Sequence, residues 1–334
     1  MIDTMMLSCT RSYCKITIFF ALVFSLISCL DQSKQEWKSH KSKTMGTTYN
    51  IVYQSDRDFS KLFEALLEEF NRTHSTYIPT STISKINAAK KTEITFAIDT
   101  SFMSVYSSAL EVAHLSNGYF DYTVMPIVSH YGFGPQQAKK DTLMDWDEFI
   151  GYTNVSVVPD NDSMVITKMD ERVSIDFSAI AKGAAVDLVA DFLRTKGIDN
   201  FMVEIGGEVF CSGVNSKEMI WRIGVESPEK GKKFLEVINV EDCAVATSGN
   251  YRNIRVIDGK KYAHTIDPYQ GKPVLTDVLS ATVLSKSCAH ADAWATAFMA
   301  MGSEKAKQIA VDRKLRVLLA IADSNGVKIW KTSK

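Results

Sequence analysis

Two oxygen-bearing side chains four residues apart, Asp292 and Thr296, lie in a predicted helix near the C-terminal end of the sequence. Side chains at positions i and i+4 of a helix lie one above the other on one face. A carboxylate and a hydroxyl placed in this way suit a small divalent cation such as Mg²⁺. Apolar neighbours predict that the helix is largely buried, and a buried carboxylate needs a partner. Two interpretations stay open on this segment alone: a metal site, or local hydrogen bonds that cap Asp292 and tie Thr296 to a carbonyl.

Further segments combine glycine or turn residues with polar side chains. They are residues 118–126, 130–135, 176–183, 204–208, 246–251 and 264–268. Glycine lets the backbone approach a ligand closely. Amides at the start of a helix expected from Ile180 could meet phosphate oxygens, and Lys182 would add a positive charge there. For each segment alone a purely structural role is favoured, with Gly206 and Gly207 as a hairpin turn and Lys182 as a solvated helix residue.

Composition and missing motifs narrow the classes of function. The 334 residues are 46% hydrophobic and 23% charged, which is ordinary for a globular protein with a sizeable core. A formal net charge of -1 without a long basic run argues against nucleic-acid binding. The sequence contains no G-x-x-x-x-G-K-[ST] loop, no G-x-G-x-x-G fingerprint and no G-x-S-x-G elbow. The usual nucleotide-binding and hydrolase classes are therefore weakened.

The first residues of the chain have the pattern of a targeting signal. Arg11 and Lys15 precede an apolar run at residues 16–27, which is too short for an ordinary membrane span. The run ends in Leu-Ile-Ser-Cys29, which resembles a bacterial lipobox and predicts a lipid on Cys29. We therefore expect a signal peptide at 1–28 and a polar tether at 29–43. A plain secretory signal or an uncleaved anchor are the alternatives.

The three remaining cysteines indicate no shared site. Cys211, Cys243 and Cys288 are neither a disulfide framework nor spaced for zinc. Buried free thiols are expected, with one bridged pair as the alternative.

The elements that must position the polar segments form an irregular series. Helical periodicity marks residues 59–74, 101–116, 180–196, 291–301 and 303–312, and strand patterns include 47–54, 154–158, 163–168 and 173–176. A turn at 323–326 joins two strands near the end of the chain. Many strands joined by short turns, with helices scattered among them, predict an α+β fold with mixed, largely antiparallel sheets. Residues 44–334 contain no linker and are expected to form one compact, possibly bilobed, domain.

Nine segments occur in an order that points to a family. They are MGTT from Met45, STY from Ser75, GYFDYTVMP, YGFGP, DFSAIAKG, EIGGE, ATSGNYRN, HTIDPYQGKPV and ADAWATA. Together they resemble the FAD:protein FMN transferase family, also called the ApbE family. The resemblance covers nearly all of residues 44–302. Each segment is weak on its own, but the ordered series is specific.

The resemblance implies an enzyme that binds FAD and Mg²⁺. Such enzymes break the FAD pyrophosphate, attach FMN through a phosphodiester to a Thr or Ser hydroxyl of a target protein, and release AMP. Matching positions make the carbonyl of Ala179 and the side chains of Asp292 and Thr296 the metal ligands. The implied flavin contacts are Met45, Tyr77, Tyr119, Phe120, Asp121, Asp176, Lys182, His264 and Ile266.

Two residues are expected to serve catalysis directly. Asp292 would do so by holding the cation. His264 is the candidate base for the acceptor hydroxyl, because imidazole titrates near neutral pH. A flavin-positioning or structural role for His264 is the alternative, and Asp267 would either orient it or cap the turn at Pro268.

The sequence also departs from the family pattern. Family members often carry glycine where Ser178 and Ala179 stand, but a backbone ligand tolerates alanine. Tyr131 replaces a usual tryptophan and keeps an aromatic face. The usual Gly-Gly-Asp turn ends in Glu208, which leaves the role of that carboxylate open.

The leading hypothesis is an Mg²⁺-dependent flavin transferase, lipid-anchored in the bacterial cell envelope and facing the periplasm or exterior. Its partners would be FAD, an exported flavoprotein acceptor and the membrane, without nucleic acid. An FAD pyrophosphatase is the close alternative, since water would replace the protein hydroxyl at the same site. A lipoprotein that binds FAD without chemistry is the alternative from another class, and a redox flavoenzyme is disfavoured by the expected metal.

Overall fold

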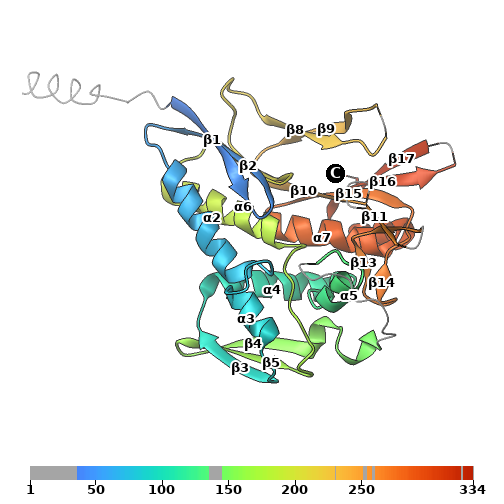
Figure 1. Cartoon of the computed structure of the whole chain (residues 1–334). Coiled ribbons are helices and arrows are strands. Elements are labelled where there is room, and N and C mark those ends of the chain that lie inside the picture. The colour runs from blue at the N-terminus through green and yellow to red at the C-terminus, as the bar shows by residue number, and fades with distance from the viewer. Residues whose placement is uncertain are drawn as a thin grey trace, which may run out of the picture.

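The largest element of the fold is an eight-stranded antiparallel sheet, which crosses the upper part of the computed structural model in Figure 1. The structure describes residues 36–134, 145–229, 231–250, 254–257, 260–324 and 326–333. The strands lie in the order β1-β2-β6-β7-β10-β15-β16-β17, and every neighbouring pair is antiparallel. Their bounds are Glu36–Thr44 (β1), Thr47–Ser55 (β2), Phe201–Ile205 (β6), Glu208–Ser212 (β7), Cys243–Gly249 (β10), Val278–Ser285 (β15), Arg316–Asp323 (β16) and Gly326–Lys331 (β17).

Two helices, α6 (Ala181–Thr195) and α7 (Cys288–Met301), pack against one face of this sheet. Nearly every residue of α7 is buried, which is expected of a helix that is apolar on all sides. The two helices touch where Gly183 meets the first turn of α7. A Cβ atom on Gly183 would lie 2.3 Å from the carbonyl oxygen of Cys288, so only glycine fits at this contact.

A hairpin of β8 (Trp221–Glu226) and β9 (Phe234–Val240) covers part of the opposite face of the sheet (Figure 1). Trp221 packs there with Val209 and Val245 of the sheet. The indole N–H of Trp221 donates to the carbonyl oxygen of Ser212 at 2.9 Å, so the one polar atom of this ring is satisfied. The large sheet is thus buried on both sides along its middle.

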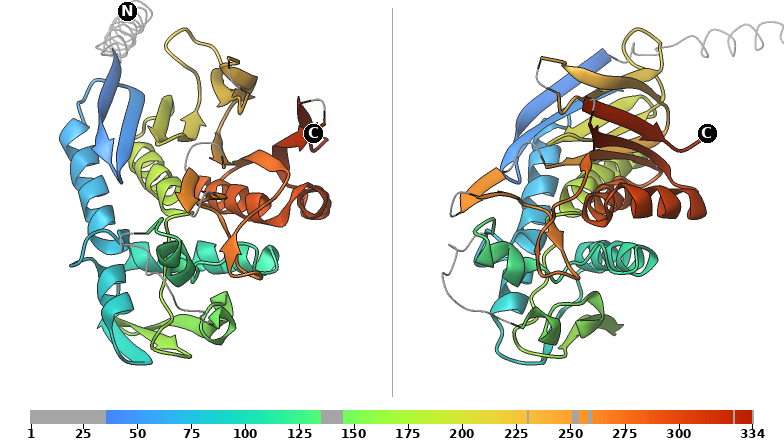
Figure 2. Two further views of the ribbon diagram at one scale, coloured as in Figure 1. Left: turned by 45° about the vertical axis from the view of Figure 1, so that its right-hand side comes forward. Right: turned by 90° about the vertical axis from the view of Figure 1, so that its right-hand side faces the viewer.

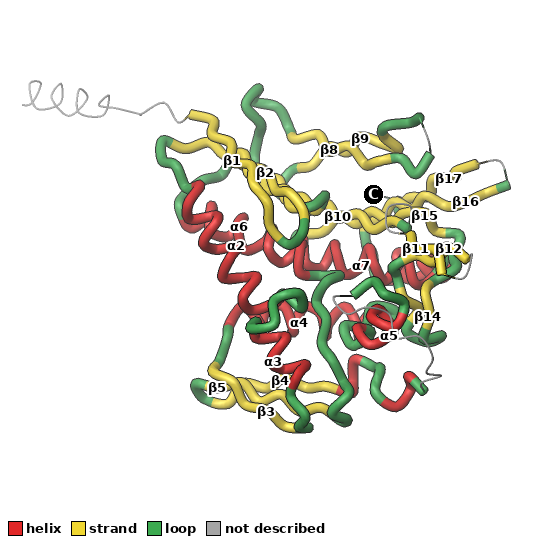
Figure 3. Tube along the Cα trace, in the orientation of Figure 1, coloured by secondary structure: helices red, strands yellow, loops and turns green. Residues whose placement is uncertain are grey.

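The lower half of the molecule contains a second, smaller sheet with helices above it. Figure 3 shows the helices lying between the large sheet and this small one, and Figure 2 shows the same layering from two other sides. The small sheet has the strand order β3-β5-β4. The bounds are α2 (Ser60–His74), α3 (Thr82–Ala88), β3 (Glu93–Ala97), α4 (Thr100–Leu115), β4 (Val155–Asp160) and β5 (Ser163–Lys168).

Short elements and loops fill the region between the two halves. Their bounds are α5 (Met125–His130), η1 (Trp146–Glu148), η2 (Tyr152–Asn154), β11 (Ile254–Ile257), β12 (Lys260–Ala263), β13 (Ile266–Asp267), β14 (Lys272–Pro273) and α8 (Ser303–Asp312). One continuous apolar core joins the halves, since Phe102 and Ile166 below belong to the same buried cluster as Ile205 and Phe298 above. The predicted α+β class with largely antiparallel sheets is therefore confirmed.

The predicted tether at 29–43 is wrong over residues 36–43. These residues belong to β1, which pairs with β2 along its whole length, while residues 29–35 lie outside the described part of the chain. The segment looked like a tether because its side chains are polar and rich in lysine. That composition is typical of an edge strand, where charged side chains prevent pairing with other molecules. The signal at 1–28 and the lipidation of Cys29 lie outside the described residues and stay predictions.

Two element predictions also need correction. Residues 173–176 form no strand, although the N–H and carbonyl of Ile175 are bound by the side chain of Asn87. The backbone is satisfied by a side chain instead of a neighbouring strand, and an apolar run cannot distinguish these two cases. The helix predicted at 291–301 begins three residues earlier, at Cys288, because Ser287 caps it.

Two further observations complete the description. Cys211, Cys243 and Cys288 are buried free thiols, as predicted. Within the described ranges, no helix has both the length and the apolar character needed to span a membrane.

Candidate active site

A cavity of about 640 Å³ opens where the start of α6, the turn between β6 and β7, the end of β10 and one face of α7 meet the loops of the lower half. Segments from seven different parts of the sequence contribute to its wall. Eleven of the predicted site residues line it: Tyr77, Tyr119, Phe120, Asp121, Asp176, Ala179, Lys182, His264, Ile266, Asp292 and Thr296. The cavity is therefore where the fold brings the predicted flavin and metal residues together.

Met45 is the one predicted flavin contact that does not line this cavity. It forms the tight turn between β1 and β2 together with Gly46, and both residues have positive φ angles, 49° and 71°. Its side chain is partly buried against the main core. The described contacts of Met45 are thus those of a turn residue.

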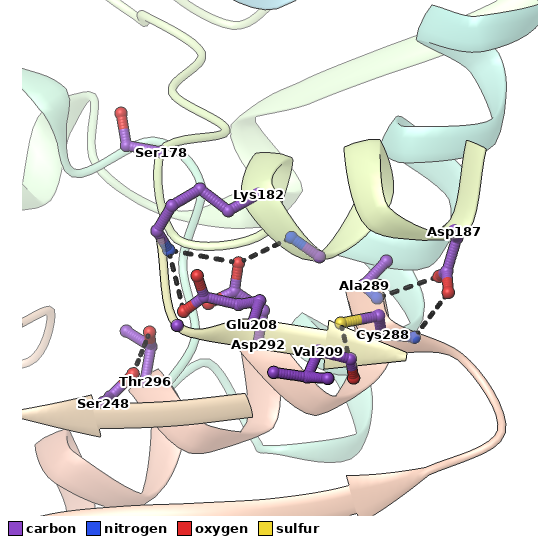
Figure 4. A network of polar contacts seen from close by, with 12 residues as sticks. Ser178, Lys182, Asp187, Glu208, Val209, Ser248, Cys288, Ala289, Asp292 and Thr296 are labelled. Atoms are coloured by element: carbon purple, nitrogen blue, oxygen red, sulfur yellow. Dashed lines mark hydrogen bonds and ion pairs between the residues drawn. The ribbon is translucent and has the colours of Figure 1, made fainter. Parts of the chain in front are cut away.

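A cluster of one partly exposed ammonium and two buried carboxylates forms the deep end of the cavity (Figure 4). Lys182 Nζ lies 3.1 Å from Glu208 Oε1 and 3.5 Å from Asp292 Oδ2. Glu208 and Asp292 are only 3% and 2% exposed. The two carboxylates raise the pKa of Lys182, so the ammonium stays charged despite its burial. When both carboxylates are ionised, the cluster carries one more negative than positive charge.

The carboxylate of Asp292 caps the first turn of α6. The N–H of Gly183 donates to Asp292 Oδ2 at 3.1 Å. Gly183 is the third residue of α6, so its N–H is one of the donors that have no partner within the helix. Ala179 stands two residues before the helix and lines the cavity. Its carbonyl lies outside the hydrogen-bond ladder of α6, which fits its predicted role as a backbone ligand.

Thr296 continues the same face of α7, one turn beyond Asp292. Its hydroxyl lies 3.2 Å from the hydroxyl of Ser248, at the end of β10, and both residues line the cavity. The described partner of the Thr296 hydroxyl is thus a side chain of another element. The described residues do not show the alternative, a hydrogen bond from this hydroxyl to a carbonyl of its own helix. Asp292 and Thr296 present two oxygens from one helix face, as their spacing predicts.

A third carboxylate fixes α7 against α6. Asp187 of α6 accepts hydrogen bonds from the N–H groups of Cys288 and Ala289 at 2.8 and 3.0 Å, and from the hydroxyl of Ser287 at 2.8 Å. It thereby satisfies donors at the helix start that would otherwise be unpaired. Burial is the main influence on Asp187 and raises its pKa. Nothing in the sequence marked Asp187, because its partners lie about a hundred residues away.

Glu208 is the functional candidate whose role the sequence left open. It follows the two-residue turn of Gly206 and Gly207 and begins β7. Oε1 meets Lys182, while Oε2 is buried with no hydrogen-bond partner in the described structure. Burial, together with the charge of Asp292, raises the pKa of Glu208 to about 7, against the opposing effect of Lys182. A buried carboxylate oxygen without a partner is costly and marks this position as functional.

The other end of the cavity is aromatic. Tyr119 lies in the wall, and the ammonium of Lys305 sits 4.5 Å from the centre of its ring and bonds to its hydroxyl. The ring of Tyr269 packs against Tyr119 from the outside, with 5.0 Å between ring centres. Tyr77 is 64% exposed at the rim. Flat apolar faces of this kind suit a flat ring system such as a flavin.

Two predicted acidic contacts also hold loops in place. Asp121 accepts from the N–H and hydroxyl of Thr123 at 2.7 and 2.6 Å, and from the N–H of Tyr152 at 2.9 Å. Asp176 accepts from the N–H and hydroxyl of Ser178 at 3.0 and 2.5 Å. Burial raises the pKa of both carboxyl groups. Their positions in the cavity wall are thus fixed by short local bonds.

His264 lies in the cavity wall between β12 and β13, with its ring 6.4 Å from that of Phe133. Asp267, the residue proposed to orient it, instead accepts hydrogen bonds from the N–H groups of Tyr269 and Gln270 at 2.9 and 3.2 Å. The described contacts of Asp267 therefore match the alternative in which it caps the turn at Pro268.

The donor set fits a hard cation better than a soft one. Across the described ranges, no three His, Cys, Asp or Glu residues gather as a metal cluster. The predicted ligands are of other kinds, namely a carbonyl, a single carboxylate and a hydroxyl. Three protein oxygens leave coordination positions of the cation open for water and for phosphate oxygens. Mg²⁺ usually keeps such ligands when it binds a protein. The excess negative charge of the cluster also favours a cation.

The family of this chain follows from comparison with known sequences. The pattern that defines the ApbE family matches residues 45–319. The chain therefore belongs to the ApbE family.

Individual relatives agree with this assignment. A protein named FAD:protein FMN transferase from Vibrio cholerae is 38% identical over 303 residues, covering 87% of this chain and 89% of that protein. A protein of the same name from Haemophilus influenzae is 32% identical and covers 92% and 93%. The solved structure of the flavin transferase ApbE from V. cholerae has a TM-score of 0.80 at 36% identity, covering 90% of this chain and 98% of that one. The predicted ApbE-like fold is therefore confirmed.

Proposed function

We propose that this chain is an FAD:protein FMN transferase that moves FMN from FAD to a Thr or Ser hydroxyl of a flavoprotein. The observation that carries the proposal is a single cavity with a buried, charged end at Lys182 and Asp292 and an aromatic end at Tyr119. FAD has a charged pyrophosphate and a flat ring system. The relatives named FAD:protein FMN transferase cover most of this chain and support the same conclusion.

The transfer exchanges the phosphoanhydride bond of the FAD pyrophosphate for a phosphoester bond to the acceptor. The acceptor hydroxyl oxygen bonds to the phosphorus of the FMN half, while the bond from that phosphorus to the AMP oxygen breaks. The hydroxyl proton leaves to a base, and AMP departs with the bridging oxygen. Such chemistry needs positioning and charge neutralisation more than covalent help from the protein. Lys182, held in the cavity wall, provides a fixed positive charge beside the pyrophosphate.

Mg²⁺ is part of the proposal. Ala179 through its carbonyl, with Asp292 and Thr296 through their side chains, would hold it at the deep end of the cavity. When bound, the cation polarises pyrophosphate oxygens and stabilises negative charge on the departing AMP. The protein would keep this end dry, because the carboxylates around it are almost completely buried.

His264 is proposed to take the proton of the acceptor hydroxyl. Its position in the cavity wall supports this role. A base contributes about 10²- to 10⁴-fold to a rate, so His264→Asn should lower transfer by that factor. Binding of FAD should change little. Loss of FAD affinity with an unchanged rate of transfer from bound FAD would instead show that His264 positions the flavin.

The envelope location is also a proposal. The lipobox at Cys29 supports a lipid anchor on the membrane surface, with an exported flavoprotein as the acceptor. Radiolabelled fatty acid should be incorporated into the wild-type chain and not into Cys29→Ala. Incorporation into both would show that Cys29 is not the lipidated residue.

The deciding experiment follows two products at once. The chain, purified in detergent, is incubated with FAD, Mg²⁺ and an exported flavoprotein domain as the acceptor. Release of AMP together with an acceptor heavier by one FMN moiety, and loss of both with a chelator, would establish transfer. AMP and free FMN with an unmodified acceptor would favour the pyrophosphatase. Tight FAD binding without AMP under any metal would leave a flavin-binding lipoprotein.

A further inference from the structure

We propose that Glu208 is a positioning residue: it holds the Lys182 ammonium in place so that Asp292 stays available to a divalent cation. The inference rests on the proposed function, because it assigns a role to a residue beside the proposed metal ligands. Neither the family resemblance nor the motif spacing assigned this carboxylate a task.

The distances show how the ammonium is shared. Lys182 Nζ is closer to Glu208 Oε1, at 3.1 Å, than to Asp292 Oδ2, at 3.5 Å. Only the first separation is within ordinary hydrogen-bond distance. Glu208 therefore makes the shorter contact with Lys182, and Asp292 makes the longer one.

The contacts of Asp292 are consistent with this arrangement. Lys182 and the N–H of Gly183 both approach the same oxygen, Oδ2. Oδ1 is therefore the oxygen that remains for a ligand in the cavity. Without its anchor on Glu208, the flexible Lys182 side chain could move onto the Asp292 carboxylate and compete with a cation for it.

Burial strengthens the competition between the Lys182 ammonium and a cation for the carboxylate of Asp292. Both carboxylates are at least 97% buried, so the attraction between an ammonium and a carboxylate is much larger here than at the surface. Glu208 Oε2 has no described partner and therefore places no second restraint on this side chain. Oε1 is therefore the one atom of Glu208 through which this side chain holds Lys182.

A cycle of variants separates this role from a direct contact between Glu208 and the cation. The binding of Mn²⁺, a spectroscopic substitute for Mg²⁺, is followed by the electron paramagnetic resonance signal of free Mn²⁺ at pH 8. The chain is used in detergent, with and without FAD. Glu208→Gln should weaken Mn²⁺ binding about tenfold, since lost supporting contacts typically cost 10- to 100-fold in metal affinity. In a Lys182→Met background, the same change should alter the affinity less than about twofold, because no ammonium remains to be positioned.

The matched control is Glu204→Gln. Glu204 lies on β6 in the same hairpin, its Oε1 accepts the N–H of Gly207 at 2.8 Å, and it does not line the cavity. It should leave Mn²⁺ affinity unchanged. A tenfold loss from Glu208→Gln that persists without Lys182 would overturn the proposal in favour of a direct or purely electrostatic effect. Unchanged affinity in Glu208→Gln would also overturn it.

A second measurement uses the wild-type chain and so does not depend on whether a variant folds. Lysine amines are labelled competitively with acetic anhydride and quantified by mass spectrometry. Lys182 should be acetylated at least tenfold more slowly than the exposed Lys217, both with and without saturating Mn²⁺, because Glu208 retains it. Release of Lys182 by Mn²⁺ would overturn the proposal. If the wild-type chain binds no Mn²⁺ but still transfers FMN, the metal site and the role of Glu208 both fail while the proposed transfer stands.

Discussion

The two ends of the cavity are built in different ways. At the charged end, Lys182, Glu208 and Asp292 stand on two helices and a strand of the main core, and their carboxylates are almost fully buried. At the aromatic end, Tyr77 and Tyr119 stand on loops between elements, and Tyr77 is 64% exposed. Under the proposed function, the difference teaches that the phosphate chemistry would fall on helices and a strand, whereas the flavin ring would be received by loops. Small errors in position cost more where bonds are made and broken.

The sharpest test of the charged end is Asp292→Asn. The amide oxygen can still accept the N–H of Gly183, so the helix contact should survive while the charge is lost. Transfer should fall about a hundredfold or more, because the main charged ligand of the cation is removed. The rate of AMP release measures this directly.

Asp277→Asn is the matched control for that substitution. Asp277 also accepts from a helix start, the N–H of Ser303 at 2.9 Å, but it does not line the cavity. It should cost about 1 kcal/mol of stability, as for a weakened helix cap, and leave transfer intact. Equal losses of transfer in both variants would mean that Asp292 acts through the structure alone.

The close packing of α6 against α7, which positions the charged end, can be disturbed by a substitution at Gly183. In Gly183→Ala, the new Cβ would meet the carbonyl oxygen of Cys288 at 2.3 Å, so α6 and α7 must move apart. We expect the free energy of unfolding to fall by about 3 kcal/mol, as for overpacking of a close contact. Transfer should fall with it, because Lys182 and Asp292 separate. Urea unfolding and AMP release together check the prediction.

Gly197→Ala is the control for that substitution, because it adds the same methyl group next to α6 but away from the contact with α7. Gly197 follows the helix with a φ of 71°, and nothing lies within 4 Å of its added Cβ. The cost should be about 1 kcal/mol from the left-handed backbone alone. Transfer at a temperature where the protein is folded should be unchanged. Wild-type stability in Gly183→Ala would contradict the close contact of the two helices.

The charged end should also make the stability of the protein depend on pH, through the titration of Glu208. The pKa of Glu208 is raised from 4.5 to about 7 in the folded state, so the folded protein binds its proton more tightly than the unfolded chain. The free energy of unfolding should therefore fall as pH rises from about 4.5 to 7, by roughly 2 to 3 kcal/mol from this group. Urea titrations at pH 5 and pH 8, in the presence of a chelator, measure the change.

Glu208→Gln should make that decline smaller by the contribution of this one group, since the amide does not titrate, while Asp121, Asp176 and Asp187 keep their contributions. Glu236→Gln is the control, because Glu236 is paired with Lys331 at 2.6 Å, on strands away from the cavity. It should keep the decline of the wild-type chain. A Glu208→Gln variant with the full decline would assign it to other groups.

Substitutions at the aromatic end should have the smallest effect, and they should change the affinity for FAD. Tyr119→Ala removes one ring from the wall and should raise the dissociation constant of FAD about tenfold, the equivalent of one aromatic contact. Tyr119→Phe keeps the ring and should bind FAD almost as well as the wild-type chain. Flavin fluorescence measures both. A loss of transfer as large as that of Asp292→Asn would break the distinction between the two ends.

Much of the fold could be predicted from local patterns. The helices at 59–74 and 101–116 and the final hairpin agree with the structure because a period of 3.6 or 2 is visible within one segment. The strand β1 was missed because its polar sequence acquires strand structure only by pairing with β2. The strand predicted at residues 173–176 was wrong for a similar reason, since the backbone of Ile175 is bound by a side chain 88 residues away.

The candidate site shows the same division. Asp292 and Thr296 were paired correctly by their spacing on one helix, and the motif order placed eleven predicted residues in one cavity. Asp187, Ser248 and the role of Glu208 were not foreseen. Serine 248 belongs to the segment ATSGNYRN, so its motif was the one available signal. For Asp187 there was none.

The sequence by itself determined the spacing of Asp292 and Thr296, the proposed cation ligands on α7, together with the glycine turn before Glu208 and the ordered motifs of the family. Each of these is written in neighbouring residues, or in their order along the chain. Only the tertiary structure decided that Lys182 is shared by Glu208 and Asp292, and that the N–H of Gly183 turns to a carboxylate 109 residues away. Those bonds form only after two helices and a hairpin have packed, because burial brings the charges together and makes pairing obligatory.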